Sequence, residues 1–285
     1  MSTPKNHHYV SQVHLKNFFN TKDGEIYIYD KSRKNLYSKK STKSVFSEKF
    51  GNSRYINGKL DHKSLEDDLN EHFEKDFPTH YNTINSFIEN RTWNKEVKDA
   101  LVYIAKYGII ADFRTPRYKQ NFEDNFFSAF QQISQSAIPE LKKEIDQMFD
   151  YKDQVQYMNV VDYSNIANKI LDLMGDLIFS IQVPRDEKDY FLIPDIAGAT
   201  SREKINQYFN PEIKEIAYIG IPLSSKIYIH YYSEKLFTKE KKPTSSLVFI
   251  DSEEVNFINK KNYDYSQNKV ACENKVFLED FIRKN

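Results

Sequence analysis

The spacing of apolar residues changes twice along the 285-residue chain, and these two changes constrain the fold more than any other feature. Residues 25–30 are rich in β-formers and follow the turn signal Asp23-Gly24, which predicts a strand in the first sixty residues. Between residues 61 and 181 apolar side chains recur every three or four positions, which predicts helices. After Pro184, compact apolar runs bounded by polar residues predict strands again.

Separate blocks of strands and helices are typical of an α+β fold. We therefore expect a small N-terminal β segment, a central helical region, and C-terminal strands with terminal helices. The spacing predicts a helix over residues 94–113 that stops at Arg114. Thr115 can then cap a new helix that has Pro116 at its first position. The apolar run 166–181 is expected to form one long helix that closes before Pro184.

The composition is that of a folded chain, since 39% of the residues are apolar and 20 Tyr and 21 Phe are present. No linker rich in Gly, Ser or Pro interrupts it. We expect a single compact domain over residues 1–285, and a division into two lobes, with 1–60 packed on 61–285, stays open. We also expect a cytoplasmic protein without a membrane partner, because the chain has neither a signal peptide nor an apolar run of the roughly 20 residues that a membrane span needs.

The net charge of zero hides an asymmetry. Residues 1–59 contain 12 Lys+Arg and 4 Asp+Glu, a balance of +8, so the remaining 29 basic and 37 acidic residues leave a balance of −8. The basic residues concentrate in Lys31, Arg33, Lys34, Lys39, Lys40, Lys43 and Lys49. A surface of this kind suits an anionic partner such as nucleic acid. It equally suits docking on the acidic helices of the same chain, and the count does not separate the two interpretations.

The opening of the chain resembles that of a bacterial family, the domain of unknown function 4238. The residues that carry the likeness are His7-His8-Tyr9-Val10-Ser11-Gln12, then Leu15-Lys16-Asn17-Phe18, and then the turn and strand of residues 24–30. Three later segments resemble signatures of that family: Arg114-Thr115-Pro116, Pro194-Asp195 after an apolar run, and Pro222-Leu223-Ser224-Ser225. The likeness runs from His7 to about residue 259.

The chain departs from the family pattern at three places. Ser11 stands where the family has Pro, Ala111 where Gln is usual, and Ile196-Ala197 where the family has a residue followed by Pro. The family has no established activity. Because some of its members resemble proteins carried on mobile elements, the resemblance implies a toxin or anti-phage role as an expectation.

His7 and His8 are the first candidate site residues. Neutral imidazole binds Zn, Mn, Ni or Fe, and near pH 7 a histidine also serves as acid or base. Neighbouring residues of a strand point to opposite faces, so both converge only in a turn or at the start of a helix. The alternative is one structural and one solvent-facing histidine.

Arg114 and Asp195 are the other candidates. An arginine at a helix end can clamp a phosphate or carboxylate, or it can complement the helix dipole and pair with Asp112. An aspartate after a buried strand can be a ligand or catalytic carboxylate, or a turn residue. His8 and Asp195 together are the candidate ligands of a divalent metal ion. The sequence contains no phosphate-binding glycine loop, no Gly-x-Ser-x-Gly and no zinc-finger spacing.

Two hypotheses follow for the function. The first is a phosphodiester hydrolase, similar to a nuclease, in which His7 or His8 acts as acid, base or metal ligand, Asp195 as second ligand, and Arg114 stabilises charge on a phosphate. The alternative is a binding or sensor module for nucleic acid or a protein partner, in which the same residues form a structural polar network. The hydrolase predicts polar residues converging in an open cleft, whereas the network predicts mutual hydrogen bonds without one.

Overall fold

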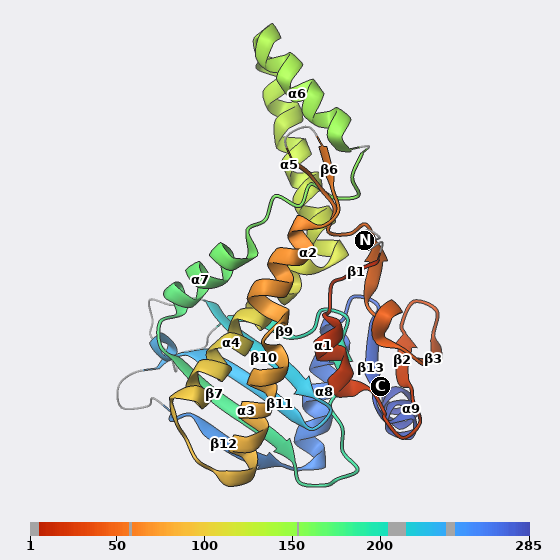
Figure 1. Cartoon of the computed structure of the whole chain (residues 1–285), viewed down its shortest axis with the longest axis vertical. Coiled ribbons are helices and arrows are strands. Elements are labelled where there is room, and N and C mark those ends of the chain that lie inside the picture. The colour runs from red at the N-terminus through yellow and green to blue at the C-terminus, as the bar shows by residue number, and fades with distance from the viewer. Residues whose placement is uncertain (1–5, 57–58, 153, 205–214, 238–242) are drawn as a thin grey trace.

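The computed structural model of the chain shows an α+β fold with two main β-sheets, helices packed over the larger sheet, and a two-helix arm that projects from the body (Figure 1). The structure describes residues 6–56, 59–152, 154–204, 215–237 and 243–285. Its strands are β1 (Asn6–His8), β2 (Ile26–Asp30), β3 (Asn35–Lys39), β4 (Ser47–Lys49), β5 (Arg54–Ile56), β6 (Lys59–Asp61), β7 (Leu177–Pro184), β8 (Ile193–Pro194), β9 (Ala199–Lys204), β10 (Glu215–Ser224), β11 (Ile227–Ser233), β12 (Ser246–Ile250) and β13 (Lys269–Cys272). Its α-helices are α1 (Gln12–Leu15), α2 (Ser64–Leu69), α3 (Phe77–Asn90), α4 (Lys95–Ala111), α5 (Pro116–Ser136), α6 (Pro139–Lys152), α7 (Tyr163–Met174), α8 (Ser252–Tyr265) and α9 (Lys275–Lys284).

The larger sheet has the strand order β12-β7-β11-β10-β9. Its pairs are antiparallel except β12 with β7, which is parallel. The register places Ile229 of β11 opposite Ile181 of β7, and both side chains are fully buried. The strand β11 is buried along most of its length, by aromatic as well as aliphatic side chains, and it lies in the region after residue 184 where strands were predicted.

The expectation of one helix over residues 166–181 is wrong. Helix α7 ends at Met174 because Gly175 has a φ of +71°, a conformation that side chains other than glycine rarely adopt. The residues that follow, 177–184, form the strand β7 inside the sheet. A continuous apolar run does not distinguish a buried helix from a buried strand by periodicity, and this run contains one of each.

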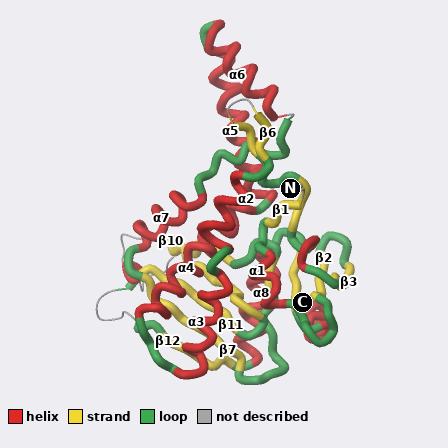
Figure 2. The backbone as a smooth tube through the Cα atoms, in the orientation of Figure 1, coloured by secondary structure: helices red, strands yellow, loops and turns green. Residues whose placement is uncertain are grey.

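Helices α3 and α4 lie over one face of the larger sheet (Figures 1 and 2). Helix α4 packs against α3, α7 and β10, and it buries one face completely. The buried side chains of that face include Val97, Leu101, Ile104 and Ala105, at the spacing that predicted the helix. A three-residue 3₁₀ turn, Asp112–Arg114, then carries the chain from α4 into the arm.

The small sheet, in the order β3-β2-β13-β8, is built from both ends of the chain. Its register sets Ile28 of β2 opposite Ala271 of β13, and both are buried. Helix α8 packs against β8 and β13, and Asp251 caps its first turn by accepting from the N–H of Glu254 at 3.0 Å. The basic N-terminal segment thus shares a sheet with residues 269–272.

Side chains of the N-terminal segment fasten it to the larger sheet. The β10–β11 pairing is irregular between Pro222 and Ser224, and the carbonyls there face the N-terminal segment. His14 Nε2 donates to Pro222 O at 2.7 Å, and Asn17 Nδ2 donates to Leu223 O at 3.0 Å. These bonds hold the preceding strand, β1, in place, where it pairs with β4.

Helices α5 and α6 form the projecting arm (Figure 1). Thr115 caps α5 by accepting from the N–H of Tyr118 at 3.2 Å, and Pro116 occupies the first position, as predicted. Between the helices, the Phe127 and Phe149 rings pack with centroids 5.0 Å apart. None of the described helices combines the length and apolar character that crossing a membrane requires.

Candidate functional site

The first two segments that resemble the family, the opening with His8 and the segment with Arg114, are in contact in the structure. Arg114 is 2% exposed, and its Nη2 donates to the carbonyl oxygen of His8 at 3.0 Å. The same nitrogen donates to Glu74 Oε1 at 2.6 Å, so the buried cation has a carboxylate partner. Glu74 closes a π-helical segment, Asn70–Glu74, between α2 and α3. Such segments are rare and are often found at functional sites.

A second set of polar side chains continues from His7. His7 is buried, and its Nδ1 accepts from the N–H of Asn52 at 2.8 Å. The side chain of Asn52 bonds to Glu66 and to Lys119, and Lys119 Nζ donates to the carbonyl of Gly51 at 2.8 Å. His7 and His8 both lie on the strand β1, so their side chains point to opposite faces, and no hydrogen bond among the described residues joins the two sets. The sets are linked by the His7–His8 backbone and by the electrostatic influence of Glu66 on His8 and of Arg114 on Lys119. We call the two sets together the polar cluster, whose members are His7, His8, Asn52, Glu66, Glu74, Arg114, Lys119 and Asn159.

Several buried atoms of the polar cluster have no hydrogen-bond partner among the described residues. They are His8 Nε2, Arg114 Nε, Arg114 Nη1 and Asn159 Oδ1. The arginine therefore uses one of its three nitrogens and leaves the N–H groups of the other two unsatisfied. Each unmet buried N–H costs about 1–3 kcal/mol, so this arrangement calls for a ligand or ordered water.

His8 is a neutral imidazole at pH 7. Burial lowers its pKa, and the nearby carboxylates of Glu66 and Glu74 only partly offset that effect. A hydrogen bond with the main chain of Thr42 also favours the charged form. Because Nε2 has no partner, Nδ1 is the nitrogen that faces Thr42, which leaves the Nε2 lone pair available as a base.

Lys119 is the site residue that sequence reasoning missed. Burial lowers its pKa to about 7, against the opposing attraction of Glu48, so the amine exchanges protons near neutral pH. It lies on α5 four residues before the buried Glu123, which in turn precedes the buried Phe127 by four. The available signal was the spacing of four residues that places Lys119 and Glu123 on the same face of the helix as the buried Phe127. The other phenylalanines of the helix obscured this signal.

Backbone strain concentrates around Lys119 and His7. Phe46 and Phe50 have φ values of +47° and +59°, and Asn159 has +49°. Asn159 Nδ2 donates to Gly51 O at 3.1 Å, the same carbonyl that Lys119 binds. Residues in this region of φ cost about 1–3 kcal/mol each and cluster at functional sites, where the surroundings hold them.

Asp195 lies in a different environment. It is 3% exposed, and its two carboxylate oxygens accept from the N–H groups of Gln267, Asn268 and Lys269 at 2.7, 2.8 and 2.9 Å. These bonds fasten the turn after β8 to the start of β13. Among the described residues no hydrogen bond joins Asp195 to the polar cluster.

The residues that the structure describes contain no group of three or more His, Cys, Asp or Glu side chains placed to hold a metal ion. Of the expected ligand pair, His8 faces Thr42 and Asp195 binds three backbone N–H groups.

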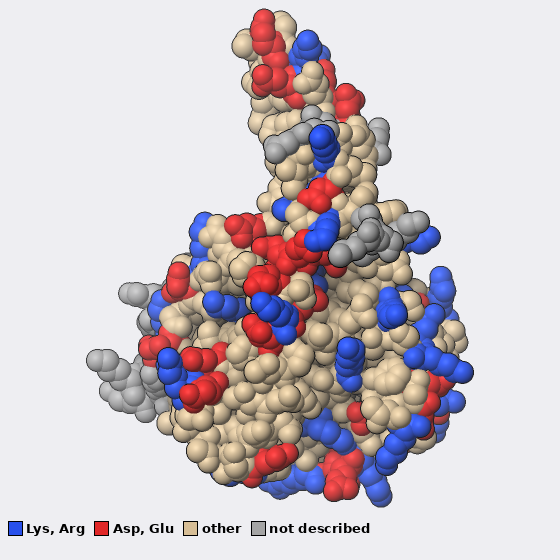
Figure 3. All heavy atoms as spheres, viewed as in Figure 1, with Lys and Arg blue, Asp and Glu red and all other residues tan. Residues whose placement is uncertain are grey.

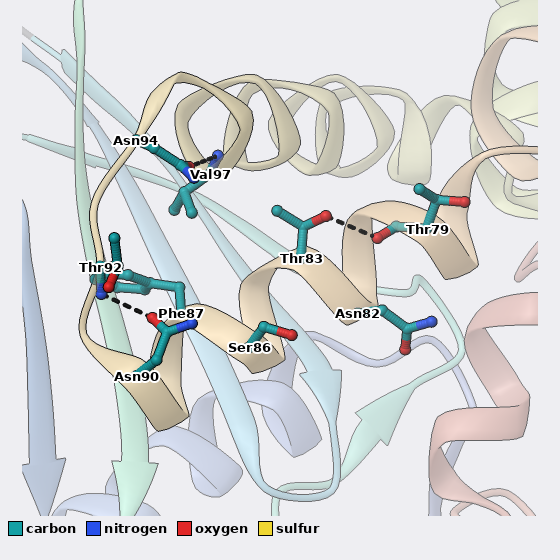
Figure 4. A pocket seen from close by; sticks show the side chains of 9 residues that line it. All are labelled: Thr79, Asn82, Thr83, Ser86, Phe87, Asn90, Thr92, Asn94 and Val97. Carbon is teal, nitrogen blue, oxygen red and sulfur yellow. Dashed lines mark hydrogen bonds between the residues drawn. The ribbon is translucent and has the colours of Figure 1, made fainter.

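Two cavities among the described residues differ in their relation to the polar cluster. A groove of about 500 Å³ lies between α3 and the start of α4, and its lining side chains are Thr, Asn, Ser, Phe and Val (Figure 4). None of these titrates, and Thr83 and Asn94 already bond to backbone groups of the two helices. Beside Lys119, Glu123 and Asn159 there is a cavity of about 10 Å³, the size of a single water molecule.

The basic N-terminal residues mostly face solvent. Lys31 is the exception, since its amine donates to the carbonyls of Tyr263 and Ser266 at 2.8 and 2.6 Å and so caps the end of α8. We call the remaining exposed residues the basic edge: Arg33, Lys34, Lys39, Lys40, Lys43 and Lys49. In the described part of the chain none of them forms an ion pair with Asp or Glu. Figure 3 shows Lys and Arg gathered along the side of the molecule where β2 and β3 lie.

The comparisons with known proteins agree with the resemblance in the sequence. No curated protein and no solved structure gives a significant match to the chain. A family model described as a protein of unknown function, DUF4238, matches residues 6–275 and so includes β1, α4, the polar cluster and β13. The chain therefore belongs to the DUF4238 family.

Proposed function

We propose that the chain is a phosphodiester hydrolase that acts on nucleic acid, with the polar cluster as its active site. The observation that carries the proposal is the set of unmet N–H groups on buried Arg114 beside the free Nε2 of His8. An arginine surrounded by acceptors is structural, whereas one with unused N–H groups is prepared for the oxygens of a phosphate.

The two hypotheses for this site predict different hydrogen bonding. A purely structural network is stable when every buried member is satisfied, because partial satisfaction is worse than an apolar core. The polar cluster has the mutual hydrogen bonds expected of a network, and its His8 and Arg114 are buried rather than set in an open cleft, but it also leaves four buried atoms unmet. The presence of both mutual hydrogen bonds and unmet buried atoms favours a preformed ligand-binding site.

The residues divide the chemistry of hydrolysis between them. Neutral His8 takes a proton from the attacking water or hydroxyl at Nε2. Arg114 stabilises the negative charge that develops on the phosphoryl oxygens, and Glu74 fixes its guanidinium in place. Lys119, whose pKa is about 7, supplies a proton to the leaving oxygen and regains it in the next cycle. The phosphodiester O–P bond breaks as the new O–P bond forms, with no net change in protons on the enzyme.

Access to the site requires a local opening. His8 is 8% exposed and Arg114 is 2% exposed, so a substrate reaches them when a covering segment moves. Helix α2 is the natural candidate, because it carries Glu66 and the irregular π-helical turn 70–74 after it can serve as the hinge, while Glu74 at the end of that turn stays on Arg114. Acidic side chains gather over α2, so its displacement would also remove negative charge from the path (Figure 3).

The basic edge supplies the attraction for nucleic acid. Its side chains are exposed and lack ion-pair partners among the described residues, which favours an external anionic partner over the chain's own helices. We place the activity in the cytoplasm, where the free thiol of the buried Cys272 stays reduced. A toxin or anti-phage role, suggested by the family resemblance, fits a nuclease of this kind.

Cleavage of end-labelled single-stranded RNA and DNA tests the proposal. The wild-type chain is compared with His8→Gln, Arg114→Lys and the control Lys142→Ala, which alters an exposed lysine of the outer arm, at equal concentration and after matching of melting temperatures. We expect cleavage by the wild type and the control and a loss of at least about 100-fold in the other two. Each reaction is run with Mg²⁺ and with EDTA, because the sequence also predicted His8 and Asp195 as metal ligands. Undiminished cleavage by folded His8→Gln would overturn the proposal.

The second candidate function is a nucleic-acid-binding module without catalysis. The absence of an open cleft over His8 and Arg114 favours it, together with the basic edge. This candidate predicts salt-dependent binding of oligonucleotides and no cleavage under either metal condition. Growth after induced expression of the wild type and of His8→Gln separates the biological roles, since only the hydrolase predicts arrest that depends on His8.

A further inference from the structure

A cleft of about 250 Å³ lies at the base of the arm, beside the polar cluster rather than within it. It is lined by Asp112, Arg117, Tyr118, Asn121, Ile196, Tyr265 and Gln267. These residues come from the first turns of α5, the turn after β8, and the end of α8. The cleft is open to solvent, unlike His8 and Arg114, since Arg117 and Asn121 are exposed and Tyr118 is half-buried.

The cleft contains the groups that recognise a nucleotide. Arg117 is a cation in the first turn of α5, and no carboxylate within the described residues forms an ion pair with it. Tyr118 is a rigid platform, because its ring packs edge-on against Phe113 at 4.7 Å and along Phe122 at 6.5 Å. Asn121 and Gln267 each present an amide, which both donates and accepts, as the edge of a base requires.

The walls of the cleft are fixed by Asp195. Its carboxylate accepts from the backbone of residues 267–269, and its own N–H donates to Lys269 O at 3.0 Å. The turn that carries Ile196 is strained, with a φ of +59° at Ala197, and these bonds hold it. Asp195 is thus a positioning residue that joins the Ile196 wall to the Gln267 wall. Its placement gives the third family signature a role at this cleft.

Chain geometry keeps the cleft close to Arg114. Three peptide steps of about 3.8 Å separate Arg114 from Arg117, so their Cα atoms lie within about 11 Å of each other. A strand that places one nucleotide in the cleft therefore has a neighbouring phosphate within reach of the polar cluster once that cluster opens.

We propose that this cleft binds one nucleotide of a single-stranded nucleic acid, with a phosphate on Arg117, the base against Tyr118, and the base edge on Asn121 and Gln267. The inference rests on the proposed function, because it names the substrate of that site. Single strands fit better than duplexes, since a stacked and paired base cannot present its face to an aromatic side chain.

Binding of fluorescent twelve-residue RNA and DNA single strands to the full chain tests the proposal. Arg117→Ala and Tyr118→Leu should each weaken binding about tenfold, whereas Tyr118→Phe, which keeps the ring, and Lys142→Ala on the outer arm should bind as wild type does. A strand with abasic sites should bind as weakly to the wild type as the intact strand binds to Tyr118→Leu. Equal binding of abasic and intact strands, or unaltered binding by Arg117→Ala, overturns the inference.

Photocross-linking with 5-iodouridine-containing strands locates the contact without relying on variant stability. We expect the cross-link on Tyr118 or Tyr265, and a cross-link confined to residues 31–49 overturns the inference. The two proposals fail separately. If binding depends on Tyr118 but no strand is cleaved, the proposed hydrolase activity alone is refuted. If cleavage depends on His8 but Arg117→Ala and Tyr118→Leu bind as the wild type does, the proposed nucleotide site in the cleft alone is refuted.

Discussion

Replacing Lys119 with methionine should remove a pH dependence of folding stability that the wild-type chain possesses. Burial lowers the pKa of Lys119 from 10.5 to about 7. Between these two values the unfolded chain holds a proton on this amine that the folded chain has released, so the free energy of unfolding rises with pH. Below pH 7 both states are protonated, and the folded chain bears the full cost of the buried cation.

The size of the effect follows from the two pKa values. The difference between 10.5 and about 7 corresponds to about 5 kcal/mol at 25 °C. The linkage relation places about 3 kcal/mol of that amount between pH 7 and pH 9.5. The charged groups that face the amine are Glu48, Glu66 and Arg114, and all three remain in the variant.

Urea unfolding, followed by circular dichroism between pH 7 and pH 9.5, measures this effect. The free energy of unfolding of the wild type minus that of Lys119→Met should increase by about 3 kcal/mol over the interval. The matched control Lys142→Met removes an exposed lysine from the outer arm, and its difference from the wild type should stay constant. Parallel curves for the wild type and Lys119→Met would refute the lowered pKa of Lys119.

Three further predictions concern buried polar groups. Burial lowers the pKa of His14 from 6.5 to about 4, so between these pH values the unfolded chain binds a proton that the folded chain does not. The wild type should therefore lose about 3 kcal/mol of stability as pH falls from 6.5 to 4. Acid unfolding of His14→Gln should lack this loss. Glu74→Gln leaves the buried Arg114 without its carboxylate and should cost about 3 kcal/mol in urea unfolding at pH 7, whereas a cost near that of the surface variant Glu71→Gln would contradict the buried ion pair. Asp195→Asn replaces a carboxylate that accepts three N–H bonds and should cost about 2 kcal/mol, and an unchanged melting temperature would show that the turn is held by other contacts.

Local signals predicted the ends of several helices because caps depend on few residues. Thr115 accepts from the backbone N–H of Tyr118, three residues later, as its sequence context indicated. Gly175 was the missed signal within 166–181, because its positive φ ends α7 and allows β7 to begin. The pairing of β2 with β13 spans more than 200 residues of chain, and no local pattern specifies such a partner.

The candidate site was predicted in part. His8 and Arg114 were selected as separate signatures, and the structure joins them through the His8 carbonyl. Lys119 was missed because charged residues on the buried side of α5 are masked by the aromatic residues beside them. Asp195 was selected because it follows an apolar run, and the structure shows that its carboxylate is buried. Its partners are backbone N–H groups of residues 267–269, which lie more than 70 residues away in the sequence, so local sequence could not identify them.

The most direct test of the central claim is to observe the Arg114 Nε–H group while a phosphodiester binds. In ¹⁵N-labelled His8→Gln protein, the Nε–H resonance of Arg114 is assigned by its loss in the same protein with Arg114→Lys, and a single-stranded oligonucleotide is then titrated in. The account predicts a large shift of this resonance that saturates together with oligonucleotide binding, because the unmet N–H gains a phosphate oxygen. A resonance that stays unmoved while the oligonucleotide saturates the protein would show that Arg114 belongs to a structural network and that the active site lies elsewhere.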